Sequence, residues 1–136
     1  MSNPRLGAIL AVAACILAAP VSTNQVVAQS VPALGDPAAG LRAFFTWCAQ
    51  CHYADKGAPS IIAPNLFGVV GRQAGYDDDY FNYSDQLLGT NLIWTEQTLD
   101  AWLTAPAQMI PGTRMEFPGL ADADRANVIA YLKQNK

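Results

Sequence analysis

The chain has 136 residues, of which 51% are hydrophobic, and its formal net charge is −3. This length allows one domain with a removable leader, and it leaves no room for a second core. The acidic balance gives the chain no electrostatic reason to bind nucleic acid.

Residues 1–28 are predicted to be a secretory signal. A single cation, Arg5, precedes an apolar and small-residue run from Leu6 to Ala19, and polar residues then lead to Val26-Val27-Ala28. This is the order of an n-region, an h-region and a cleavage region. The run is shorter than the roughly 20 apolar residues of a membrane span. We therefore expect export, with the periplasm as the destination.

Two alternatives apply to this leader. It could be retained as an N-terminal anchor, which would make the membrane a site of attachment. Cys15 could carry a lipid, but the apolar run continues through Ile16 and Leu17, whereas a lipidated cysteine normally opens a polar mature chain. Cleavage would remove one cation and no acid, so the net charge would become −4.

After a linker at residues 29–35, the domain is predicted over residues 36–136. Its first helix begins at Asp36-Pro37, an N-cap acid followed by a proline suited to the first helical position, and it ends at the cysteines that follow Trp47. From Tyr53 to Ile93 the chain is rich in glycine and polar residues, with at most a short helical turn over residues 84–88. So long a loop in a compact domain suggests that a large buried cofactor organises it.

Two further helices complete the predicted elements. Thr95 is expected to cap a helix over Glu96–Thr104, which ends at Ala105-Pro106, and a loop punctuated by proline and glycine follows. Asp122 is expected to cap the last helix, whose apolar positions include Val128 and Leu132. The predicted fold class is all-α, with three main helices around a loop-rich middle.

The central motif is Cys48-Ala49-Gln50-Cys51-His52, the attachment pattern of a c-type haem. Two thiols three positions apart reach the two vinyl groups of one porphyrin, and the adjacent imidazole becomes the proximal iron ligand. A zinc site is the first alternative, but a closed one needs four ligands and the mature chain has no other cysteine or histidine. A thioredoxin-like redox pair is the second, but it expects a βαβ context.

The single histidine also limits the other axial position. Two histidine ligands are impossible, and methionine is the remaining soft candidate. After the leader the only methionines are Met109 and Met115. Met115 lies in a loop that can aim its side chain inward, whereas Met109 could equally serve core packing.

The sequence resembles a class I cytochrome c of the mitochondrial and bacterial c2 type over nearly the whole mature chain. The matching residues are Cys48-Ala49-Gln50-Cys51-His52, Pro64-Asn65-Leu66, Gly68, Gly71-Arg72, Tyr83, Trp94, Thr98-Leu99, Ile110-Pro111-Gly112-Thr113, Met115, Phe117 and Ile129-Ala130-Tyr131-Leu132. The resemblance implies the class I cytochrome c fold, wrapped around one haem c attached through Cys48 and Cys51.

The resemblance also implies roles for individual residues. Met115, rather than Met109, would be the sixth ligand opposite His52, and the Pro64 carbonyl would accept the second imidazole hydrogen. Four residues would donate to the haem propionates: Arg72, Tyr83, Trp94 and Thr113. The first and last helices would cross where Gly40 admits close contact beside Phe44 and Tyr131.

Three departures from the family pattern bear on function. Trp102 stands where the family has a tyrosine near the methionine sulfur, and an indole has a donor but no acceptor, so we expect a changed reduction potential. The family's lysines around the haem edge are nearly absent, and Trp47 precedes Cys48, so we expect apolar docking with weak steering. Asp77-Asp78-Asp79 is a candidate cation site, although such a run is more often a solvated loop.

The function implied is a periplasmic single-electron carrier with a low-spin, His/Met-ligated haem, and not an enzyme. Its expected partners are redox proteins that donate and accept electrons, with no small-molecule substrate and with membrane contact only through those partners or an uncleaved leader. Two rivals are a dedicated subunit of a periplasmic oxidoreductase and a haem sensor or enzyme with an open sixth position.

Overall fold

The computed structural model describes residues 35–77 and 79–136, so the predicted signal and nearly all of the predicted linker lie outside the described residues. The helices in this part are α1 (Pro37–Trp47), α2 (Asp85–Leu88), α3 (Glu96–Thr104), α4 (Pro106–Met109) and α5 (Asp122–Gln134). Over the same ranges there is no strand, only an isolated antiparallel bridge between Gln73 and Ile93. The predicted all-α class is therefore confirmed.

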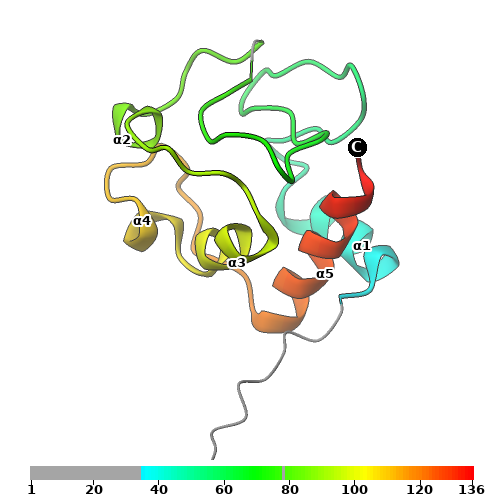
Figure 1. Ribbon diagram of the computed structural model, residues 1–136. Helices are drawn as coiled ribbons and strands as arrows, with labels where there is room; N and C mark the ends of the chain where they lie inside the picture. The colour runs from blue at the N-terminus through cyan, green and yellow to red at the C-terminus, as the bar shows by residue number, and fades with distance from the viewer. Residues whose placement is uncertain (1–34, 78) are drawn as a thin grey trace, which may run out of the picture.

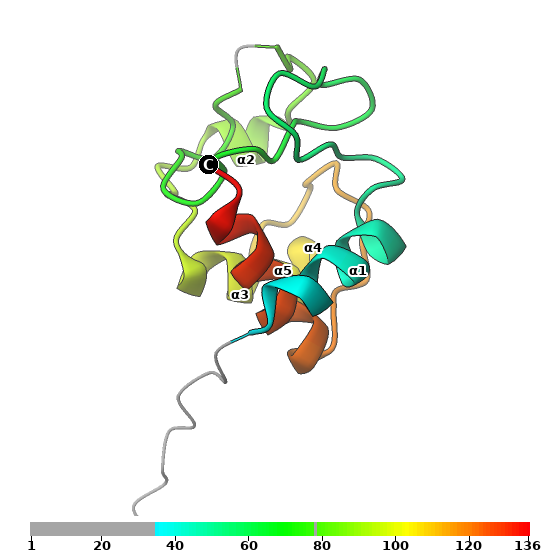
Figure 2. The same ribbon diagram turned by 90° about the vertical axis from the view of Figure 1, so that its right-hand side faces the viewer.

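The first and last helices, α1 and α5, lie side by side and cross (Figures 1 and 2). A Cβ atom on Gly40 would lie 2.0 Å from the backbone oxygen of Asn127, so only glycine allows this approach. The rings of Phe44 and Tyr131 pack beside the crossing with their centroids 5.3 Å apart. Gly35, the last residue of the predicted linker, has the same close contact with the oxygen of Ala126 on α5. The crossing expected at Gly40 is thus present.

The helices begin mostly where the sequence predicts. The Asp36 carboxylate accepts a hydrogen bond from the Ala38 amide, and the Thr95 side chain accepts one from the Thr98 amide. The cap predicted at Asp122 is wrong, because the N-cap residue is Ala121 and Asp122 is already helical. The short helix α4 was not predicted. Its four residues have no side-chain cap, and Pro106, expected only to end α3, also begins it.

Arg125 joins α5 to α3. Its Nε donates to Asp100 Oδ1 at 2.6 Å, one Nη donates to the Leu120 carbonyl at 3.0 Å, and the other lies 3.1 Å from Asp122 Oδ1. The Arg125 side chain is only 12% exposed, so these partners must replace the hydration that its charge loses on burial. Asp122 therefore contributes to the N-terminal end of α5 as an ion-pair partner of Arg125 and not as a cap.

We expect Arg125→Ala to lower the free energy of unfolding by about 2 kcal/mol, since hydrogen bonds to charged groups in partly buried sites each contribute strongly. The matched control is Lys133→Ala, because Lys133 and Glu96 form an ion pair at 2.7 Å with both side chains about half exposed. That change should cost less than about 1 kcal/mol. Urea denaturation of both variants measures the difference, and equal losses would contradict the assignment.

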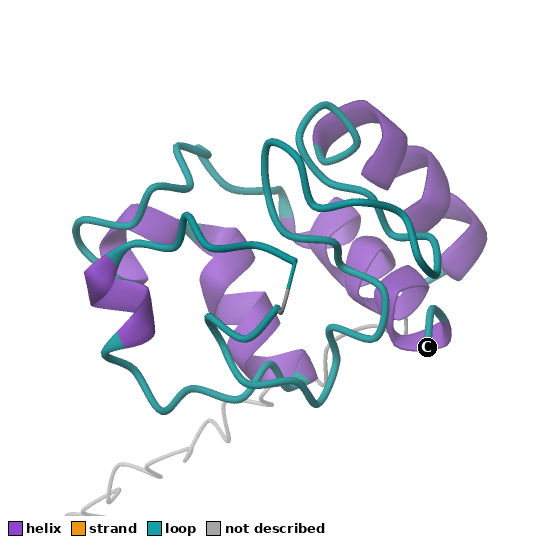
Figure 3. Cartoon of the chain, turned by 90° about the horizontal axis from the view of Figure 1, so that it is seen from above, coloured by secondary structure: helices purple, strands orange, loops and turns teal. Residues whose placement is uncertain are grey.

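The long segment between α1 and α3 is organised by side-chain hydrogen bonds as well as by backbone hydrogen bonds of its turns. The Asn65 amide group donates to the carbonyls of Asp55 and Ala58 at 2.9 and 2.7 Å, and its oxygen accepts from the Phe67 amide at 2.8 Å. Seen from above, loops and turns make up most of the near face of this half of the molecule (Figure 3). Asn65 thus fixes the loop that carries Pro64.

None of the helices within residues 35–77 and 79–136 combines the length and the hydropathy that a membrane crossing requires.

Candidate functional site

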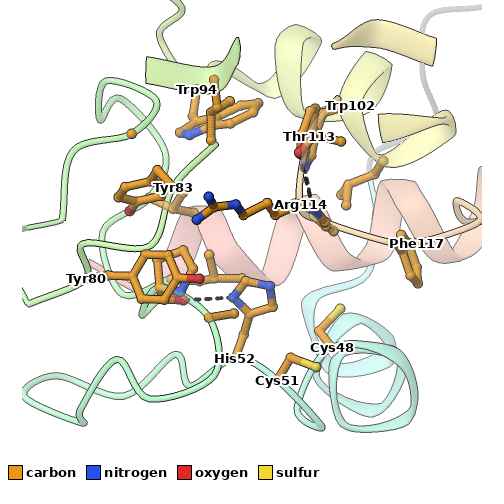
Figure 4. Close-up of a pocket in the computed structure, with 18 of the residues that line it drawn as sticks. Cys48, Cys51, His52, Tyr80, Tyr83, Trp94, Trp102, Thr113, Arg114 and Phe117 are labelled. Carbon is orange, nitrogen blue, oxygen red and sulfur yellow. Dashed lines mark hydrogen bonds between the residues drawn. The ribbon is translucent and has the colours of Figure 1, made fainter. Parts of the chain in front are cut away.

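A cavity of about 360 Å³ lies between the cysteine motif at the end of α1, the long loop and α3. All ten residues predicted from the sequence line it: Cys48, Cys51, His52, Pro64, Arg72, Tyr83, Trp94, Trp102, Thr113 and Met115. Figure 4 shows Trp94, Trp102 and Thr113 across the cavity from His52, Cys48 and Cys51. Residues up to 67 positions apart in sequence are therefore brought to one site.

His52 is held in one tautomer. Its Nδ1 lies 2.7 Å from the Pro64 carbonyl oxygen, marked by a dashed line in Figure 4. Because a carbonyl only accepts, Nδ1 must carry the hydrogen, which leaves the Nε2 lone pair free. Burial lowers the pKa of His52, and the Pro64 contact opposes this in part. The imidazole is consequently neutral near pH 7 and able to bind a metal.

The two thiols differ in environment. Cys48 is half-buried and Cys51 is exposed, and both are free. Burial raises the pKa of the Cys48 thiol to about 11, so it keeps its hydrogen at neutral pH. The turn after α1 fixes the pair, since the amides of Cys51 and His52 both donate to the Cys48 carbonyl, at 3.0 and 2.9 Å.

Met115 is the methionine that reaches the cavity, and Met109 does not line it. The indole Nε1 of Trp102 donates to Met115 Sδ at 3.2 Å, the second dashed line in Figure 4. Trp102 is 5% exposed and its ring packs 5.3 Å from that of Trp94. The Met115 amide donates to Thr113 Oγ1 at 3.3 Å. The thioether is thus positioned by a rigid aromatic donor and by its own loop.

The residues expected at the propionates form the polar part of the wall. Arg72 donates from its two Nη atoms to the carbonyls of Asn65 and Phe67, at 2.7 and 3.4 Å, and part of its donor capacity remains. Burial, with a contribution from Asp77, raises the pKa of Tyr83 to about 12, so its phenol stays protonated. Arg72 opposes that rise. Trp94 is nearly buried, at 8% exposure.

Several lining residues were not singled out from the sequence, among them Ile62, Tyr80 and Arg114. The ring of Tyr80 stacks edge-on against Tyr83 with centroids 4.8 Å apart, and its hydroxyl donates to the Ile62 carbonyl at 3.3 Å. Arg114 donates to the Asn82 carbonyl at 3.1 Å and to the Asn82 side chain. Its position beside Met115 was the only available signal. Tyr80 and Ile62 carry no motif that could have revealed them.

Asp77 ties the long loop together. Its Oδ2 accepts from Ser60 Oγ at 2.7 Å and from the Asn65 amide at 3.0 Å, and its Oδ1 accepts from the Asp79 amide at 3.1 Å. Among the described residues, which omit Asp78, no three metal-ligating side chains of the His, Cys, Asp or Glu types come together. In the described part of the acidic run, the Asp77 carboxylate therefore stabilises the long loop through hydrogen bonds.

These residues fit a covalently attached haem. The cavity volume lies in the range of cofactor and ligand pockets, and the walls are mainly apolar with a few convergent polar groups. A neutral imidazole nitrogen and a thioether sulfur are an iron-porphyrin ligand set. Two thiols line the same cavity beside the imidazole.

Comparison with known proteins gives the same result. The family model described as cytochrome c matches residues 37–136. The chain is 46% identical over 101 residues to "Cytochrome c" of Theileria annulata, covering 74% of this chain and 86% of that protein. It is 46% identical over 103 residues to "Cytochrome c2" of Rhodoblastus acidophilus, covering 75% and 94%.

A solved structure, "cytochrome cH from Methylobacterium extorquens", is 40% identical, with a TM-score of 0.68, and the match covers 74% of this chain and 99% of that one. The predicted fold is thereby confirmed, as is an electron-transfer rather than enzymatic role with one haem c at Cys48 and Cys51. The chain belongs to the class I cytochromes c.

Proposed function

We propose that this electron-carrying cytochrome c works in the periplasm with a haem iron ligated by His52 and Met115. The observation that carries the proposal is one cavity lined by both a neutral imidazole with a free Nε2 and a thioether already held by Trp102. When bound, haem c supplies a reversible one-electron couple.

The chain's own residues would hold the haem in place and exclude water from it. Pro64 fixes the orientation of the imidazole, and the hydrogen bond from Nδ1 to the Pro64 carbonyl makes the imidazole a better ligand. Buried apolar side chains on the cavity wall, among them Leu99, Val128 and Leu132, exclude water. Arg72 and the phenol of Tyr83 offer donors to the propionates, whose charge would otherwise have to be buried unpaired.

The location and the partners belong to the same proposal. The signal pattern in residues 1–28 supports export. With Met115 as the sixth ligand, neither oxygen nor peroxide could bind the iron, so the proposed ligation favours an electron carrier over a haem sensor. Redox proteins on either side, a donor and an acceptor, are the partners such a carrier requires.

The test is expression in a host that attaches haem c and exports the product. We expect a mass increase of one haem, a pyridine haemochrome spectrum of the c type, and the weak near-red ferric band typical of methionine ligation. The periplasmic fraction should contain protein that begins after Ala28. Absence of the near-red band would overturn the ligand assignment, and a cytoplasmic product would overturn the location.

Removal of the Trp102 donor should lower the reduction potential. An N–H group donated to Met115 Sδ withdraws electron density from the ligand and so favours ferrous iron. We expect Trp102→Phe to lower the midpoint potential by tens of millivolts, since about 59 mV corresponds to a tenfold change for one electron. The midpoint potential of Trp102→Tyr, which keeps a donor, should fall less than that of Trp102→Phe. Equal potentials in redox titrations of all three proteins would contradict the role of the indole.

A further inference from the structure

Large apolar side chains are exposed next to the cysteine motif. Trp47, Tyr53, Ile61 and Ile62 are 48%, 45%, 68% and 64% exposed. They come from two segments of the chain, the end of α1 and the loop after His52, so their exposure is not the edge of a single helix. We call these four residues, together with Cys51, the apolar collar.

Two hollows make the collar continuous with the cofactor cavity. Tyr53, Ile61 and Ile62 line a shallow hollow of about 90 Å³ together with Cys51. Cys51 and Ile62 also line the main cavity, as does Trp47. Cys51 is exposed and is one of the two haem attachment residues. A protein bound to the collar would therefore contact the wall that carries the attached cofactor.

The collar contains no formal charge. The side chains that line the small hollow are all uncharged: Ala49, Gln50, Cys51, Tyr53, Ile61 and Ile62. Electrostatic pairing at this surface would have to come from its rim. A partner that recognised this surface by charge would find nothing to pair with at its centre, so the complementary surface must be apolar.

The size of the collar decides between a partner and a second copy of the chain. Four side chains exposed by half to two thirds offer on the order of a few hundred Å². A stable dimer requires about 800 Å² from each subunit. Weak electron-transfer complexes occupy the small end of the interface range. Two copies of an acidic chain would also repel each other.

We propose that the collar is the docking site for a redox protein whose own cofactor edge lies beneath an uncharged, apolar surface. This inference rests on the proposed electron-carrier function. It also narrows the apolar docking expected around the haem edge, for which the sequence offered Trp47, to a surface centred on Ile61 and Ile62. Apolar contact would hold the complex briefly, and dissociation would stay fast because the buried area is small.

The experiment uses the haem-loaded, full-length mature protein and a defined probe. The probe is a small blue-copper protein with an uncharged apolar surface around its copper ligand, and the comparison probe is the same protein with a lysine placed in that surface. Binding is measured by NMR line broadening with both proteins reduced, so that no electron transfer is needed. Electron-transfer rates are measured separately by stopped flow.

The test variant is Tyr53→Ser with Ile61→Ser, because neither residue lines the main cavity. We expect its affinity for the first probe to fall about tenfold. The matched control is Leu88→Ser on α2, which removes another half-exposed apolar side chain, 52% exposed, away from both hollows. The control should bind like the parent protein. Equal losses in both variants, or none in either, would overturn the proposal.

A pair of charge variants tests the chemistry of the partner surface. Ile61→Lys and Ile61→Glu should both weaken binding to the first probe, and added salt should change the parent's affinity little. Stronger binding by either variant would mean a charged docking surface and would overturn the proposal. The haem spectrum and reduction by a small dye are checked in every variant. Normal values there with unchanged docking would refute the collar while leaving the electron-carrier function intact.

Discussion

Replacement of Met115 by alanine should abolish the near-red ferric band and lower the reduction potential on the order of a hundred millivolts or more, since axial ligation spreads haem potentials over about 0.8 V. The reason is geometric. Met115 lines the cavity with His52, and its sulfur accepts a hydrogen bond from Trp102 at 3.2 Å. The other methionine of the described residues, Met109, does not line the cavity and so is not placed to replace it.

Met109 provides the matched control. It is the other methionine of the described residues, it is also half-buried, and it lies at the end of α4 outside the cavity. Met109→Ala should keep the near-red band and the potential of the parent protein. Added imidazole should bind readily to the Met115→Ala protein and poorly to the Met109→Ala protein. If the Met109 variant were the one to lose the band, the ligand assignment would be wrong.

The two methionines also show what the sequence could and could not decide. Residue type alone left both as candidates, and the family resemblance selected Met115. The structure adds a physical reason: α4 begins at Pro106, one residue beyond the end of α3, and its last residue, Met109, does not line the cavity. A four-residue helix without a side-chain cap has no periodicity to detect, so this feature could not be predicted locally.

The site itself was more predictable than the loop that builds its outer wall. Each of the ten expected residues has a chemical signature or a family match, and all of them line one cavity. The hydrogen bonds that connect Ser60, Asn65 and Asp77 join positions up to 17 residues apart. Their pairing depends on the folded path of the chain, and no local pattern indicates it. The helix starts capped by Asp36 and Thr95 were predictable because their capping bonds span only two or three residues.

Gly40→Ala should destabilise the fold by at least about 3 kcal/mol, although the same change at an exposed helix position is stabilising by roughly 0.5–1 kcal/mol. The sign reverses because the added methyl would lie 2.0 Å from the Asn127 oxygen and 2.8 Å from the Cβ atom of Tyr131. The first of these is backbone, so no side-chain rotation can relieve the clash. The helices would have to separate and lose the Phe44–Tyr131 contact.

The control for this change is Gly57→Ala. Gly57 has a φ of 76°, and a Cβ there meets nothing within 4 Å, so its cost is backbone strain alone, about 1–2 kcal/mol. Thermal unfolding of the haem-loaded proteins should show a much larger loss for Gly40→Ala. A Gly40→Ala protein as stable as its parent would mean that the α1–α5 crossing tolerates a wider separation. In that case the haem attachment motif at the end of α1 would not depend on close contact with α5 for its position.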